Sequence, residues 1–174
     1  MIENLLMYKR KIYVDTSVIS HLLHEDTPEK MRDTISFWMD IQAGRYDVAI
    51  SHLTFSELEE CREPKRSELL AQVRAISYTF LPKSLESESL ANAYIQGEVL
   101  TIRHKVDALH IALAVSSGCD IIVSWNFKHM VRMSTIQKVR TVNIQKGYFK
   151  ILDIVSPTTM LVEGGDDDDE RAGS

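Results

Sequence analysis

The chain has 174 residues, of which 44% are hydrophobic and 26% are charged, as is typical of a single soluble globular domain. No apolar run reaches the roughly 20 residues that a membrane-spanning helix needs, and the N-terminus lacks the layout of a signal peptide. The two cysteines have no metal-binding spacing, so neither a disulfide framework nor a zinc site is indicated, and we expect a cytoplasmic protein.

Acidic and basic residues are distributed unevenly along the chain. Residues 157–174 contain six acids and one arginine, which account for the formal net charge of −5, so the remainder is formally neutral. Residues 121–150 contain six lysines and arginines and no acid, which can create a positive face. We expect one domain over residues 1–156, followed by an acidic, disordered tail over residues 157–174.

Apolar runs and helical periodicities alternate along the chain. Strands are predicted at residues 11–14, 47–51, 78–81, 121–125 and 150–155. Helices are predicted from Val18, over 29–43, from about 52, from Pro64 to about 75, over 84–100, from about 106, and over 127–146. This alternation predicts an α/β domain with a mainly parallel sheet.

Three acids lie where an apolar segment meets the start of a helix. Asp15 follows the first strand, Glu57 follows the second, and Asp107 begins the helix before the fourth. Each has a structural alternative, since Asp15, Thr16 or Ser17 can cap a helix and Thr54-x-x-Glu57 resembles a capping box. In a parallel sheet, however, such junctions gather at one edge, where ligands bind.

Clustered carboxylates repel one another unless a cation compensates them, so a hard divalent metal such as Mg²⁺ or Mn²⁺ is the simplest explanation. Asn126 follows the fourth strand and would add an amide oxygen at the same edge, whereas Asp120 precedes that strand and is expected at the opposite edge. The chain has no serine nucleophile elbow, Walker loop or GxGxxG motif. Metal-dependent phosphoryl chemistry is therefore favoured.

Three blocks of the sequence together resemble a known family. They are YVDTSVIS, HLTFSELEE and VDALHIALAVSSGCDIIVSWNFKHM, and they resemble, over roughly residues 11–156, the PIN-domain family, especially the VapC-like toxin ribonucleases. The resemblance implies a three-layer α/β/α sandwich with a parallel sheet and Mg²⁺- or Mn²⁺-dependent cleavage of RNA, usually without a covalent intermediate. It also implies a frequent homodimer and a small antitoxin that covers the acidic crevice.

The resemblance assigns roles to individual positions. Asp15, Glu57 and Asp107 match the family's acids, and Asn126 stands where many members have a fourth acid, which favours one well-occupied metal site. The resemblance places Thr16 and Ser17 as the small polar residues after the first acid, expected to contact substrate.

Four further residues near these blocks have expected roles of their own. Lys128 and His129 are candidates for phosphate contact. His110 lies on the apolar side of its helix and is expected to be packed and hydrogen-bonded. Trp125 can stack on a base, although packing is the simpler interpretation.

These observations support a metal-dependent endoribonuclease that acts as the toxin of a toxin–antitoxin pair. A non-catalytic RNA- or protein-binding module is the alternative, motivated by Asn126. A haloacid-type phosphatase would need an acid where the chain has Ser17, and a receiver domain would need an acidic pair that the chain lacks.

Overall fold

The computed structural model describes residues 8–162 and contains a parallel five-stranded sheet in the order β3-β2-β1-β4-β5. Register is set by Val14 of β1 pairing with Val123 of β4, and Tyr13 pairing with Ala49 of β2. The strands are β1 (Lys11–Val14), β2 (Asp47–Ser51), β3 (Thr79–Leu81), β4 (Ile121–Val123) and β5 (Asp153–Val155). The predicted parallel α/β sheet is therefore confirmed.

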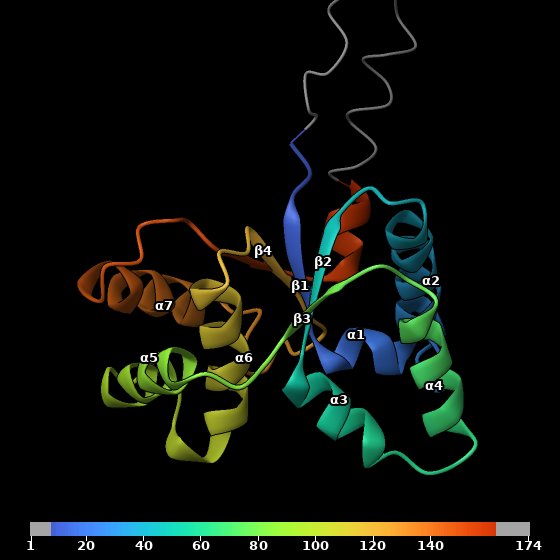
Figure 1. The fold of residues 1–174 in the computed structure, drawn as a ribbon, viewed down its shortest axis with the longest axis horizontal. Helices are drawn as coiled ribbons and strands as arrows, with labels where there is room; N and C mark the ends of the chain where they lie inside the picture. The colour runs from blue at the N-terminus through green and yellow to red at the C-terminus, as the bar shows by residue number, and fades with distance from the viewer. Residues whose placement is uncertain (1–7, 163–174) are drawn as a thin grey trace, which may run out of the picture.

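Helices cover both faces of this sheet, giving the predicted three layers (Figure 1). One face is covered by α5 (Leu85–Gln96), α6 (Lys105–Ser116) and α7 (Met133–Gln145). The other is covered by α1 (Thr16–His21), α2 (Pro28–Gln42), α3 (His52–Glu59) and α4 (Lys65–Arg74). A 3-10 turn, η1 (Ile102–His104), leads into α6.

Alternating residues of each strand fill the two cores. In β1, Ile12 and Val14 pack under α1 and α2, whereas Tyr13 packs against α6. The same alternation occurs in β4, where Ile122 faces the side opposite to Ile121. Successive strand side chains point to opposite faces, so a strand buried on both sides is a continuous apolar run. This explains why the short runs KIYV and IIV form central strands.

The strand order reverses between β1 and β4. From β1 the chain moves outward through β2 to β3, returns through α5 and α6, and then adds β4 and β5 on the other side of β1. In open α/β sheets the crevice outside the carboxyl ends of the strands at such a reversal binds ligands. The fold therefore places a candidate crevice where Asp15 follows β1 and residues 124–126 follow β4.

Two segments differ from their predicted extents. Helix α7 begins at Met133 rather than near residue 127, because the carbonyl of Asn126 closes a turn by accepting the N–H groups of Met130 and Val131. Residues 157–162 are helical, and Met160 packs in the core beside α2, so the folded part continues past the predicted end at residue 156. The rest of the predicted tail, 163–174, lies outside the described residues.

Replacing Met160 with alanine is expected to lower the free energy of unfolding by about 2–4 kcal/mol, because the side chain is 2% exposed and its removal leaves a cavity. Val162 lies in the same short helix but is 66% exposed, so Val162→Ala is the matched control. Urea denaturation of both variants measures the difference. Equal stabilities for the two variants would contradict the packing of this helix against the core.

Candidate active site

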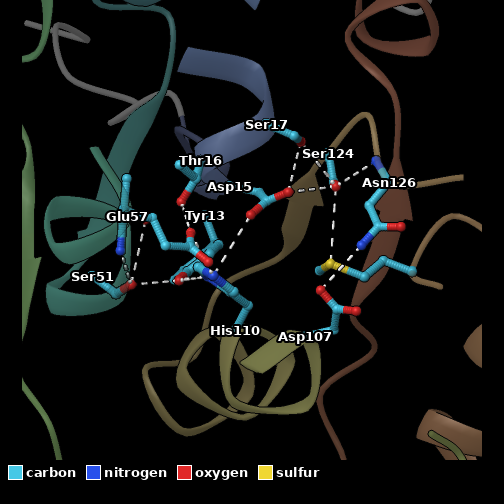
Figure 2. Close-up of polar contacts among 12 residues, drawn as sticks. Tyr13, Asp15, Thr16, Ser17, Ser51, Glu57, Asp107, His110, Ser124 and Asn126 are labelled. Atoms are coloured by element: carbon cyan, nitrogen blue, oxygen red, sulfur yellow. Dashed lines mark hydrogen bonds and ion pairs between the residues drawn. The ribbon is translucent and has the colours of Figure 1, made fainter. Parts of the chain in front are cut away.

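Asp15 is held in the crevice by hydroxyl groups rather than serving as a helix cap. It occupies the N-cap position of α1, but its carboxylate makes no capping hydrogen bond. Instead, Oδ2 accepts hydrogen bonds from Ser17 Oγ and Ser124 Oγ, each at 2.7 Å (Figure 2). The side chain is buried, so these two donors compensate part of the cost of removing the carboxylate from water. The capping interpretation of Asp15 is therefore wrong.

Ser17 connects the ends of β1 and β4. Its hydroxyl donates to Asp15 and accepts the backbone N–H of Trp125 at 2.9 Å. Its hydroxyl therefore positions Asp15, and its predicted contact with substrate stays a prediction. Ser124 shares that task, and its only sequence signal is its place directly after β4.

Glu57 faces the same crevice from α3. The cap of α3 is Ser51, whose hydroxyl accepts the N–H of Thr54 at 3.4 Å, so the predicted Thr54–Glu57 capping box is wrong. Glu57 Oε2 accepts a hydrogen bond from Thr16 Oγ1 and lies 3.3 Å from His110 Nε2. Thr16 therefore orients Glu57, and its predicted contact with substrate stays a prediction.

His110 is buried between the two carboxylates. Its Nε2 lies 3.8 Å from Asp15 Oδ1, and its Nδ1 lies 2.6 Å from Tyr13 Oη, which in turn is 2.6 Å from Ser51 Oγ. The predicted packed, hydrogen-bonded role is confirmed, but the ring also reaches the crevice. Neither Tyr13 nor Ser51 was identified from the sequence, because a hydroxyl on an apolar strand carries no local signal of function.

The charges of this cluster influence one another. Burial alone would lower the pKa of His110, but the hydrogen bond to Glu57 and the nearby charges of Asp15, Glu57 and Asp107 raise that pKa. For Glu57, burial acts to raise the pKa, but His110 and the Thr16 hydroxyl lower it. A protonated His110 can donate to both Glu57 and Tyr13, which leaves every member of the network satisfied.

Asp107 lies beside this cluster in the first turn of α6. Its Oδ1 accepts a hydrogen bond from Asn126 Nδ2 at 3.1 Å, and its Oδ2 accepts one from His129 Nδ1 at 2.9 Å. Burial raises the pKa of Asp107, and this effect outweighs the opposing contribution of His129. The crevice therefore holds a carboxylate whose charge is costly without a further cation.

Two hydrogen bonds hold the amide of Asn126, whose oxygen is predicted to be a metal ligand. Its Oδ1 accepts the backbone N–H of His129 at 3.0 Å, so its amide nitrogen is the end that faces Asp107. That N–H needs an acceptor, which fixes the orientation of the amide. Asn126 and His129 thus both position Asp107, while the Lys128 side chain is exposed beside them.

The grouped donors suit a hard divalent cation. Ligand atoms of Asp15, Glu57 and His110 lie within 4.8 Å of one another, and carboxylate oxygens are the preferred ligands of Mg²⁺ and Mn²⁺. Asp107 borders this group and contributes electrostatically to it. Asp15 and Glu57, with His110 between them, therefore fit a metal of this class, whereas Asp107 is not among these grouped ligand atoms.

Other sequence expectations concern the surroundings of the crevice. Asp120 lies at the opposite edge as predicted, where it accepts the Lys11 N–H at 2.7 Å and pairs with Lys150 at 2.8 Å. Trp125 is 7% exposed and its Nε1 donates to Thr34 Oγ1 at 2.8 Å, so the packing interpretation is confirmed. The ring of His104 lies 3.7 Å from that of His129, so Arg103, His104 and Lys105 lie near the residues that hold Asp107.

None of the helices in the described part of the chain has both the length and the apolar character needed to cross a bilayer.

Comparison with known proteins identifies the family. A search of curated proteins found no match. The family model of the PIN domain matches residues 12–129, which include Asp15, Glu57, Asp107 and Asn126. Because this match spans more than half of the chain, the protein belongs to the PIN-domain family, whose members are typically metal-dependent nucleases.

Proposed function

We propose that this protein is a metal-dependent endoribonuclease that uses Mg²⁺ or Mn²⁺ to hydrolyse RNA phosphodiester bonds. The observation that carries the proposal is the convergence of Asp15 and Glu57 with His110 within 4.8 Å, at the point where the strand order reverses and with Asp107 alongside. One buried acid and two half-buried acids gathered in this way cost stability, and they are explained if they serve chemistry.

The side chains of the crevice have separate tasks in this proposal. Asp15, Glu57 and Asp107 would hold the metal, which when bound supplies a Lewis acid for the phosphate and lowers the pKa of water. Ser17 and Ser124 keep Asp15 in place, and Asn126 keeps Asp107 in place. His110 keeps Glu57 ionised by hydrogen bonding to it.

Basic groups at the rim would contact the RNA backbone. Lys128 is exposed next to Asn126, and Arg103 and Lys105 are exposed beside His104. Their positive charge would attract phosphate groups toward a crevice that is itself acidic. His129 bonds Asp107 through its Nδ1, which leaves its Nε2 for the predicted phosphate contact.

Chelation tests the proposal directly. Purified protein is expected to cleave single-stranded RNA with Mn²⁺ or Mg²⁺ and to lose this activity with EDTA, and Glu57→Gln is expected to lower the rate by at least about 100-fold. Glu60→Gln, an exposed acid at the end of the same helix, is the matched control and should cleave normally. Cleavage that persists in EDTA would contradict the proposal.

We further propose that the enzyme is the toxin of a toxin–antitoxin pair, acts as a homodimer and is inhibited by a small antitoxin. The family assignment supports this role, since PIN domains often pair with antitoxins. Induced expression in bacteria is expected to arrest growth for the wild type and not for Glu57→Gln. A short neighbouring open reading frame whose product restores growth would identify the antitoxin.

A non-catalytic RNA-binding module is the second candidate. Asn126 favours it, because this position holds an amide in place of a fourth acid. The oxygen of that amide already accepts the backbone N–H of His129. Protein that binds RNA but does not cleave it with either metal would support this candidate.

A further inference from the structure

A cluster of aromatic rings and one lysine lies beside the crevice. His21 at the end of α1 stacks on His24, with ring centroids 4.8 Å apart, and lies 5.7 Å from Trp125. The Phe127 ring is 5.9 Å from that of Trp125, at an angle of 61°. Lys30 Nζ lies 5.3 Å from the centroid of Trp125 and 5.4 Å from that of Phe127.

Only one of the two larger rings is available to a ligand. Trp125 is 7% exposed, and its indole nitrogen is occupied by Thr34. Phe127 is 46% exposed although Trp125 and Lys30 both contact it. Lys30 Nζ lies over the Phe127 ring, and the part of the ring that remains exposed is the surface left for a planar partner.

The cluster is rigidly connected to the acids of the crevice. The backbone N–H of Trp125 donates to Ser17 Oγ, which holds Asp15, and His21 Nδ1 bonds the carbonyl of Ser17 at 2.6 Å. Phe127 directly follows Asn126, which holds Asp107. The exposed ring and the carboxylates therefore belong to one hydrogen-bonded framework.

We propose that Phe127, supported by Trp125 and Lys30, is a stacking subsite for an unpaired nucleobase next to the phosphate bound at the acids. This inference rests on the proposed ribonuclease function and adds where the substrate is held. A base offers a flat π surface to the ring, and Lys30 adds positive charge for the adjoining phosphate. An aliphatic protein partner would gain nothing from that charge, so single-stranded RNA is the occupant that fits both features.

Binding of a short, unstructured, adenosine-rich RNA is compared with binding of the same sugar–phosphate chain without bases. Phe127→Ala is expected to weaken binding of the RNA about 5- to 100-fold and to leave binding of the abasic chain unchanged, because only the RNA can stack. Phe127→Tyr should bind RNA like the wild type, and Phe127→Leu should behave like Phe127→Ala. Phe149→Leu, another exposed phenylalanine that lies before β5 at the opposite sheet edge, is the control and should have no effect.

A second readout reports stacking itself. Fluorescence of 2-aminopurine placed in the RNA should be quenched by the wild type and by Phe127→Tyr, but not by Phe127→Leu. If Phe127→Ala weakens binding of the RNA and of the abasic chain equally, or weakens binding of neither, the proposed stacking subsite is wrong. This conclusion holds even if the protein cleaves RNA. If the wild type never cleaves but the base-dependent loss occurs, the subsite stands and the nuclease assignment fails.

Discussion

Asp107→Asn is expected to reduce RNA cleavage by at least about 100-fold without destabilising the metal-free fold. The substitution removes a charge that the proposed metal needs. It also removes a charge that is costly without metal, because burial raises the pKa of Asp107 despite its bond to His129. Asparagine retains an oxygen that can accept from Asn126. Loss of activity therefore comes with equal or greater stability, which separates a functional role from a folding role.

Two measurements on each variant check this expectation. Initial rates of RNA cleavage with Mn²⁺ give the loss of activity, and thermal unfolding in EDTA gives the change in stability. Asp47→Asn is the matched control, since this exposed aspartate begins β2 at the other end of the sheet. If Asp107→Asn unfolds at a lower temperature than the wild type and its loss of activity matches its loss of folded protein, Asp107 has a structural role.

His110→Ala is expected to lower the free energy of unfolding by about 2–4 kcal/mol in slightly acidic, metal-free solution. Removing one member of a buried ionic group leaves its partners uncompensated. The expected loss of unfolding free energy is smaller than that for a fully buried ion pair, because the Glu57 side chain is 36% exposed and water screens part of its charge. The lost ring also leaves a cavity next to Tyr13.

The effect of His110 depends on pH in a defined direction. Its pKa is raised in the folded state, so the folded protein binds this proton more tightly than the unfolded chain does. The stabilisation is therefore complete below the unfolded value of about 6.5 and is lost as the pH rises through the higher folded pKa. Bound Mn²⁺ is expected to oppose this trend, because its ligands must lose their protons and its stabilising effect on the native state therefore grows as the pH rises.

Urea denaturation across this pH range, once in EDTA and once with Mn²⁺, measures both effects. The wild type should lose stability with rising pH, and His110→Ala should show a smaller dependence. His24→Ala, which alters a partly exposed histidine outside the group of Asp15, Glu57 and His110, should keep the slope of the wild type. Parallel curves for wild type and His110→Ala would show that His110 is not the group that titrates.

Much of the fold was predictable because its determinants are local. The apolar runs KIYV and IIV must be buried on both faces, which indicates central parallel strands. Helix boundaries were less predictable. Residues 127–132 do not join α7 because the Asn126 carbonyl takes the N–H groups of Met130 and Val131, and no periodicity records that choice. The sequence likewise placed Met160 in the tail, because the residues that it packs against are distant in sequence.

The candidate site was predictable as a set of acids but not as a network. Asp15, Glu57 and Asp107 each follow a recognisable junction, and topology brings such junctions to one edge. Which partner each acid uses depends on side chains that meet only after folding. Ser124 donates to Asp15 across 109 residues of sequence, and Asn126 turns its nitrogen rather than its oxygen toward Asp107.

By itself, the sequence determined the alternating α/β order, the edge at which the acids gather and the family resemblance, because spacing and burial patterns are properties of neighbouring residues. Only the tertiary structure decided that His110 lies between Asp15 and Glu57 and that Phe127, rather than Trp125, presents an open ring. The reason is physical: hydrogen-bond partners and exposure are set by elements that pack from distant parts of the chain.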